Sequence, residues 1–335
     1  MNDFRMNESP RRGPTSAAAS SSSDTSRRSF LKLAAAAAAL GPLSLASSLR
    51  SEETPSEQPQ PTQFQIACMT LPYSQFPLQR ALTGIKSAGY EYVAWGTSHQ
   101  EGGGKDRTPV IAADAPGKTA AELGRRCRDL GLEPVLMFSG IYPEHKDAPT
   151  VLANRIRQAG AAGVPQVLTF GHTQGGNREL WIERFRKLAP IAADNNVTLV
   201  VKQHGGTTGT GEACAEITRE VDHPNIMVNY DAGNVMDYLN LDPIPDIQKC
   251  AAEVRSFCIK DHRNWPKDQD CGPGLGEIDH YRLLHPVAFT GRAMPLACEN
   301  IFAPLSARPT EPEGVDQLAR RARLFLETVI AGLQA

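Results

Sequence analysis

Eight short apolar runs recur along the chain from residue 63 onward, and longer amphipathic stretches separate them. The runs cover Phe64–Met69, Tyr90–Trp95, Glu133–Phe138, Gln166–Phe170, Val197–Lys202, Ile226–Tyr230, Ser256–Ile259 and Met294–Cys298. Such runs are typical of strands that are buried on both faces. The stretches between them have the apolar spacing of helices that pack by one face. They cover Leu78–Ala88, Thr119–Leu130, Val151–Ala162, Arg178–Asn195, Glu212–Val221, Pro245–Val254, Asp279–Ala288 and Val315–Leu333.

Strands that alternate with helices predict a parallel sheet, and eight such units favour a closed (β/α)8 TIM barrel of one domain over residues 63–335. An open, doubly wound sheet is the alternative fold. It is disfavoured because the first strand leads into Cys68–Pro72 and not into a G-x-G-x-x-G phosphate-binding turn. A barrel places its functional residues at the carboxyl ends of the strands.

The N-terminus has the pattern of a twin-arginine signal peptide. Arg27 and Arg28 directly precede the apolar run Leu33–Leu45, which is shorter than the ~20 residues that span a membrane. We therefore predict a signal peptide over residues 1–46 and a flexible Pro-rich linker over 47–62. The twin-arginine export machinery becomes an expected partner, the location periplasmic or extracellular, and stable membrane insertion is not expected.

Charge and cysteine content argue against a nucleic acid partner and against a disulfide framework. Without residues 1–46 the chain has 29 basic and 34 acidic residues, a formal net charge of −5, and no basic stripe that would indicate a nucleic acid partner. The seven cysteines form no C-x-x-C pair, and Cys68, Cys258 and Cys298 lie in predicted strands. These features predict buried free thiols and no disulfide framework.

Polar residues gather at the predicted carboxyl ends of the strands, where a barrel brings them to one face. The alternation of side chains along a strand places Lys202 and His204 on one face and Gln203 on the other. By the same rule Cys258, Lys260 and His262 share a face, opposite Asp261. The polar set at the strand ends is Ser98, His99, Ser139, Tyr142, His172, Lys202, His204, Asp231, Asn234, Lys260, His262 and Glu299.

The segment Gly272–Asp279 (GPGLGEID) precedes a predicted helix. Glycines such as Gly274 allow close approach of the backbone, and its amides could bind hydroxyl or anionic oxygens. The alternative is a turn that leads into the helix, with Asp279 as the cap.

Several stretches in order resemble the xylose isomerase-like TIM-barrel family, the sugar phosphate isomerases and epimerases. They are VTLVVKQHGG, NYDAGNVMDY, SFCIKDHRN, GPGLGEID and PLACEN. The resemblance implies a divalent metal held by Glu, Asp, His and Glu from strands five to eight, with the two glutamates as acid and base. Asp231 and Glu299 match this pattern. Lys202 replaces the first Glu, Cys258 replaces the metal-binding His, and Asn234 stands at a further family His.

Two arrangements of the site follow from these replacements. In the first, the Lys202 ammonium neutralises Asp231 and Glu299 and does part of the work of a metal ion. In the second, His204, Asp231, His262 and Glu299 hold a divalent ion of manganese, zinc, cobalt, magnesium or iron.

The resemblance implies an isomerase or epimerase, or a lyase, that removes a proton next to a carbonyl of a sugar or sugar derivative. The predicted signal peptide makes this an exported enzyme and favours a neutral or oxidised carbohydrate over a phosphosugar. Glu299 is the expected base, and Lys202, His204 and His262 are the other catalytic candidates. The alternative function is a non-catalytic carbohydrate-binding barrel that has lost the family metal site. The oligomeric state is left open. The expected substrate-binding residues are His99, His172, Asn234, Lys260 and Gly274.

The signal peptide generates the first testable prediction. Replacing both Arg27 and Arg28 by lysine should leave unprocessed protein in the cytoplasm, as measured by cell fractionation and immunoblotting. Arg11 and Arg12 are the matched control pair because no apolar run follows them. Normal processing of the variant with both Arg27→Lys and Arg28→Lys would contradict the prediction.

Overall fold

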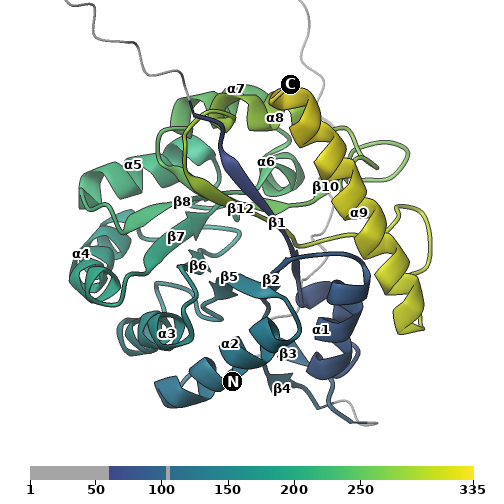
Figure 1. Cartoon of the computed structure of the whole chain (residues 1–335). Helices are drawn as coiled ribbons and strands as arrows, with labels where there is room; N and C mark the ends of the chain where they lie inside the picture. The colour runs from purple at the N-terminus through teal and green to yellow at the C-terminus, as the bar shows by residue number, and fades with distance from the viewer. Residues whose placement is uncertain (1–59, 103–105) are drawn as a thin grey trace, which may run out of the picture. The chain divides into compact units, whose positions relative to one another are not determined.

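A computed structural model describes residues 60–102 and 106–335, and its principal sheet is a closed barrel of parallel strands (Figure 1). The order around the barrel is β1-β12-β9-β8-β7-β6-β5-β2, and β2 pairs with β1 to close it. This confirms the predicted (β/α)8 fold. The barrel strands are β1 Gln63–Met69, β2 Tyr92–Trp95, β5 Glu133–Phe138, β6 Gln166–Phe170, β7 Thr198–Lys202, β8 Ile226–Tyr230, β9 Val254–Ile259 and β12 Ala293–Cys298.

The helices surround the strands and bury their apolar faces against the outside of the barrel (Figure 1). Those at predicted places are α1 Leu78–Ser87, α2 Gly117–Asp129, α3 Ala148–Ala162, α4 Arg178–Asp194, α5 Gly211–Val221, α7 Pro243–Cys250, α8 His280–Leu284 and α9 Pro312–Leu333. The 3-10 helix η2, His285–Val287, continues from α8. Another 3-10 helix, η1 Leu71–Tyr73, follows β1.

The helix α6, Ala232–Leu239, was not predicted from the sequence. It begins directly after β8 because the Asp231 carboxylate caps it, accepting the backbone N–H of Asn234 at 3.0 Å. The same residue thus ends a barrel strand, starts a helix and presents a carboxylate at the carboxyl end of the barrel.

Two short antiparallel hairpins also lie at this end of the barrel. The first pairs β3 Ser98–His99 with β4 Thr108–Pro109, and the second pairs β10 Asp261–Arg263 with β11 Gln269–Cys271. The second hairpin follows β9 and contacts α6. It carries His262 away from the barrel strand that precedes it.

The interior of the barrel is filled by the alternate residues of its strands. Ala67, Leu136, Leu168, Val200 and Ala297 belong to one buried cluster inside the sheet. Lys202 and Glu299 each stand two residues beyond a member of this cluster, so their side chains also point inward. The packed core therefore ends in a charged layer at the carboxyl end.

The predicted signal peptide, residues 1–46, lies outside the described residues, as does most of the predicted linker. Thr62, the last linker residue, is buried, and its backbone N–H donates to the Ala288 carbonyl at 2.9 Å. Among the helices of the described segments, none has the length and apolar character needed to cross a membrane.

Candidate active site

The Lys202 ammonium lies between two carboxylates at the carboxyl end of the barrel. Its Nζ donates to both oxygens of Glu299, at 2.9 and 2.8 Å, and forms an ion pair with Asp231 Oδ2 at 3.2 Å. The rings of Phe170 and Phe138 flank it, with centroids 5.2 and 5.6 Å from Nζ. The predicted grouping of Lys202 with Asp231 and Glu299 is confirmed.

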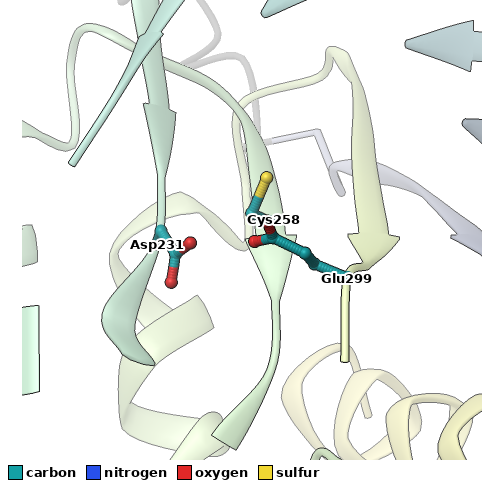
Figure 2. Close-up of side chains that lie close together, drawn as sticks. All are labelled: Asp231, Cys258 and Glu299. Carbon is teal, nitrogen blue, oxygen red and sulfur yellow. The ribbon is translucent and has the colours of Figure 1, made fainter. Parts of the chain in front are cut away.

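Three neighbouring strands deliver the groups that face the ammonium. Asp231 follows β8, Cys258 lies on β9 and Glu299 follows β12, and their side chains converge (Figure 2). One oxygen or sulfur atom from each lies within 4.8 Å of the others. Gln203 faces away from the barrel interior and accepts the Asp231 backbone N–H at 2.7 Å, which fixes the backbone at that residue.

Burial and pairing set the protonation states. Burial alone would lower the pKa of Lys202, but Glu299, with Cys258 and Asp231, raises it above its ordinary value. Burial opposes ionisation of Glu299 too, but Lys202 and Lys260 lower its pKa to about 2. Burial raises the pKa of Asp231 to about 6, although Lys260 and Lys202 act to lower it. At neutral pH the cluster therefore holds an ammonium and two carboxylates.

These residues do not fit a divalent metal ion between Asp231 and Glu299. The ammonium already occupies the space in front of both carboxylates, and a dication about 3.5 Å from it would be repelled by roughly 10 kcal/mol at an effective dielectric constant of about 20. Burial also raises the pKa of the Cys258 thiol well above its ordinary value, so the third group beside Asp231 and Glu299 is a neutral thiol. The Lys202 side chain is only 2% exposed, so it has no room to leave without rearrangement.

The predicted metal ligands His204, Asp231, His262 and Glu299 do not form one group among the described residues. Asp231 and Glu299 lie with Cys258, whereas His262 lies with Asp237 and Asp268. The strand β9 ends at Ile259, and the hairpin that follows turns the His262 ring toward α6. Side-chain alternation correctly separated His262 from Asp261 but could not foresee that turn.

His262 and Lys260 are joined by a residue that the sequence did not single out. Asp270 lies 3.0 Å from His262 Nδ1 and 2.9 Å from Lys260 Nζ. Its pKa is lowered to about 2, because Lys260 and His262 outweigh the opposing effect of burial. Lys260 also donates to the Asn234 side-chain oxygen. In the sequence, Asp270 falls in the segment after the seventh predicted strand, where no structure was predicted. Its contacts with His262 and Lys260 follow from the antiparallel hairpin of β10 and β11.

His204 lies in a line of rings between the surface and the ammonium. His172 is exposed and stacks on Tyr142, with centroids 4.0 Å apart, and Tyr142 contacts Phe170 at 5.8 Å. The His204 ring lies 4.5 Å from that of Phe170. Its Nδ1 donates to the Gly171 carbonyl at 2.7 Å, since a carbonyl only accepts. Burial and Lys202 lower the pKa of His204 to about 4, so its Nε2 is unprotonated at neutral pH.

Three expected substrate-binding residues have structural partners. Asn234 is 1% exposed, and its side-chain amide donates to the Gln203 carbonyl. His99 is also buried, with Nδ1 2.9 Å from the Phe76 carbonyl. The amide of Gly274 donates to Asp261, and Asp279 caps α8. The described contacts therefore favour the alternative reading of Gly272–Asp279 as a turn that leads into a helix.

The fold is a closed (β/α)8 TIM barrel with a charged cluster at the carboxyl ends of its strands. The sequence model of the xylose isomerase-like TIM-barrel family matches residues 82–323, and the chain belongs to this family. A comparison with curated proteins found no match.

Three solved structures illustrate the fold that this chain shares with other proteins. An L-ribulose 3-epimerase is 18% identical, with a TM-score of 0.62 over 80% of this chain and 95% of that one. The IOLI protein with a bound zinc atom is 15% identical, with a TM-score of 0.63 over 80% and 99%. A xylose isomerase-like TIM-barrel protein from Mycobacterium smegmatis, in complex with magnesium, is 16% identical, with a TM-score of 0.62 over 82% and 98%.

The ion pairs of Lys202 generate a prediction about stability. Lys202→Met should cost about 3–5 kcal/mol of unfolding free energy at pH 7.5, because two buried carboxylates lose their counter-ion. The exposed Lys146→Met is the control and should change it by less than about 0.5 kcal/mol. Denaturant unfolding at several pH values provides the measurement.

The contribution of Glu299 to the pH dependence of stability should also reverse its sign, whereas Asp231, whose folded pKa is already raised from 3.8 to about 6, disfavours folding as pH rises in the parent as well. In the parent, Glu299 has a folded pKa of about 2 against an ordinary 4.5, so its contribution is lost as pH falls from about 4.5 to 2. In Lys202→Met both carboxyl groups should have raised pKa values, so the folded state binds more protons and the variant gains stability as pH falls from 7 toward 4.5. An equal loss of stability at pH 7.5 and pH 5 would contradict the ion-pair account.

Proposed function

We propose that this protein is an exported enzyme that isomerises or epimerises a sugar or sugar derivative, by proton transfer next to a carbonyl group, with the Lys202 ammonium in place of a metal ion. The observation that carries the proposal is the position of Lys202 Nζ, 2.8 Å from Glu299 and 3.2 Å from Asp231 at the carboxyl end of the barrel. The isomerase and epimerase names of the structural neighbours support the reaction class.

Lys202 can act as the electrophile through the N–H that Glu299 does not hold. An ammonium has three N–H groups; two of them donate to Glu299, and the third faces Asp231 Oδ2 across a longer contact of 3.2 Å. A substrate carbonyl oxygen that takes the place of Asp231 as partner of this third N–H would have its developing negative charge stabilised when the neighbouring carbon loses its proton. In a site this buried, such a charge-assisted hydrogen bond is strong.

Glu299 is the proposed base. Its low pKa makes it a weak base while Lys202 holds both of its oxygens. When a substrate oxygen accepts a hydrogen bond from the Lys202 ammonium, the ion pair between Lys202 and Glu299 weakens. The proton affinity of Glu299 then rises. Glu299 then accepts the carbon-bound proton and the electron pair of that bond forms an enediolate. Return of this proton from Glu299 to the neighbouring carbon gives an isomer, whereas an epimer forms when a second donor, such as water, protonates the same carbon from the opposite face.

His204 is the proposed carrier for hydroxyl protons. Its unprotonated Nε2 lies 3.4 Å from the Tyr238 hydroxyl, and the ring lies 4.5 Å from that of Phe170, which flanks Lys202. The rings of Tyr142 and His172 extend this wall to the surface, and aromatic walls with few polar groups are typical of small-molecule sites. Export favours a neutral or oxidised carbohydrate over a phosphosugar.

A carbohydrate-binding barrel without catalysis is the second candidate. The observation that favours it is the ion pair itself, because a carboxylate with a pKa of about 2 is a poor base unless the substrate separates it from Lys202. The two candidates make opposite predictions for proton exchange at carbon.

The test is deuterium exchange at the carbon next to the carbonyl, followed by NMR in D2O with ketopentoses, ketohexoses and uronates. The chelator-treated mature protein should catalyse exchange with at least one sugar. Glu299→Gln should lower the exchange rate by about 10²–10⁴-fold, and Lys202→Met by about 10²–10³-fold. The exposed Glu91→Gln is the matched control. Sugar binding without exchange in the parent would establish the binding barrel instead, and exchange that needs added metal would contradict the ammonium mechanism.

A further inference from the structure

Three side chains outside the Lys202 cluster converge at the same end of the barrel. Asp237 lies on α6, His262 on β10 and Asp268 in the turn between β10 and β11. One ligand atom from each lies within 4.8 Å of the others. Because α6 follows β8 and the hairpin follows β9, this group lies beside the mouth of the barrel.

The His262 ring is oriented as metal-binding histidines usually are. The side chain is fully buried, and Nδ1 lies 3.0 Å from the Asp270 carboxylate, which is itself held by Lys260 at 2.9 Å. An ionised carboxylate only accepts, so Nδ1 carries the hydrogen of this bond. A carboxylate on the far nitrogen fixes the tautomer and the direction of a ligating imidazole.

The other ring nitrogen is buried and lacks a hydrogen-bond partner within the described segments. His262 Nε2 nevertheless lies 3.3 Å from Asp268 Oδ1, without the alignment of a hydrogen bond. A nitrogen lone pair this close to a carboxylate oxygen is unfavourable unless a positive charge lies between the two atoms. Two ligands that are each about 2.0–2.1 Å from a tetrahedral zinc ion stand about 3.3 Å apart, which is the separation found here.

We propose that Asp237, His262 and Asp268 bind a divalent transition metal ion, with Asp270 as the positioning residue. One imidazole and two carboxylates suit zinc, manganese or cobalt. Asp237 and Asp268 are exposed, so the ion can enter from solvent and keep open positions for water or for the hydroxyl groups of a polyol. The site does not depend on the proposed reaction, and no residue of the Lys202 ion pairs belongs to it. An imidazolium shared by Asp268 and Asp270 is the competing occupant, and the metal would replace its Nε2 proton.

The experiment is calorimetric titration of chelator-treated mature protein with Zn²⁺ at pH 7.5, repeated with Co²⁺ to record its absorption spectrum. The parent should bind one equivalent. His262→Gln and Asp268→Asn should each weaken binding by at least 100-fold, and Asp270→Asn by about 10–100-fold. Asp268 is 73% exposed, so its variant tests the site without disturbing the core.

Two controls separate this site from other sources of binding. His145 is an exposed histidine with a neighbouring carboxylate, Asp147 Oδ2, at 3.7 Å, and His145→Gln should bind Zn²⁺ like the parent. Cys258→Ser should also bind normally, and the Co²⁺ spectrum should lack thiolate charge transfer. Binding that survives His262→Gln, binding that needs Cys258, or the absence of stoichiometric binding to the parent would each overturn the proposal. If the parent binds no stoichiometric metal, a His262 imidazolium shared by Asp268 and Asp270 accounts for the site instead.

Discussion

The carboxyl end of the barrel depends on one buried interaction, the ammonium of Lys202 between Asp231 and Glu299. An uncompensated carboxylate at this depth would be costly, and two of them side by side would hold a proton or a metal ion at neutral pH. Lys202 supplies the positive charge from within the chain, on the fifth barrel strand, where the resemblance to the family would place a glutamate. That single difference of side chain changes the local charge by two and removes the need for a metal at this position.

The ion pair is also part of the fold. Asp231 caps α6 through Asn234, and Asn234 accepts from Lys260, which pairs with Asp270. Asp270 in turn orients His262 beside the mouth of the barrel. The charged layer is therefore a continuous network from the buried ammonium to the rim. A change at Lys202 is expected to act on the start of a helix as well as on the chemistry of the site.

The sequence predicted the barrel well because its strands are apolar runs of uniform length, separated by amphipathic helices. The alternation of side chains placed Lys202 and Glu299 inside the barrel because both continue the inward register of regular strands. The alternation of side chains no longer predicts their direction beyond the ends of the regular strands. The capped helix after Asp231 and the hairpin after Ile259 were not foreseen, and with them the partners Asp237, Asp268 and Asp270. Asn234 and Gly274 were predicted to bind substrate, but the first is buried and the second donates its amide to Asp261.

The most direct test of the central claim is anomalous X-ray diffraction from crystals soaked in Mn²⁺, for the parent and for Lys202→Glu, which restores the residue that the family resemblance implies. In the parent, electron density for the lysine side chain should fill the space between Asp231 and Glu299, with no anomalous peak there. In Lys202→Glu, an anomalous peak should occupy that space, because a third carboxylate replaces the ammonium. A metal peak between Asp231 and Glu299 in the parent, with the Lys202 side chain displaced, would contradict the account.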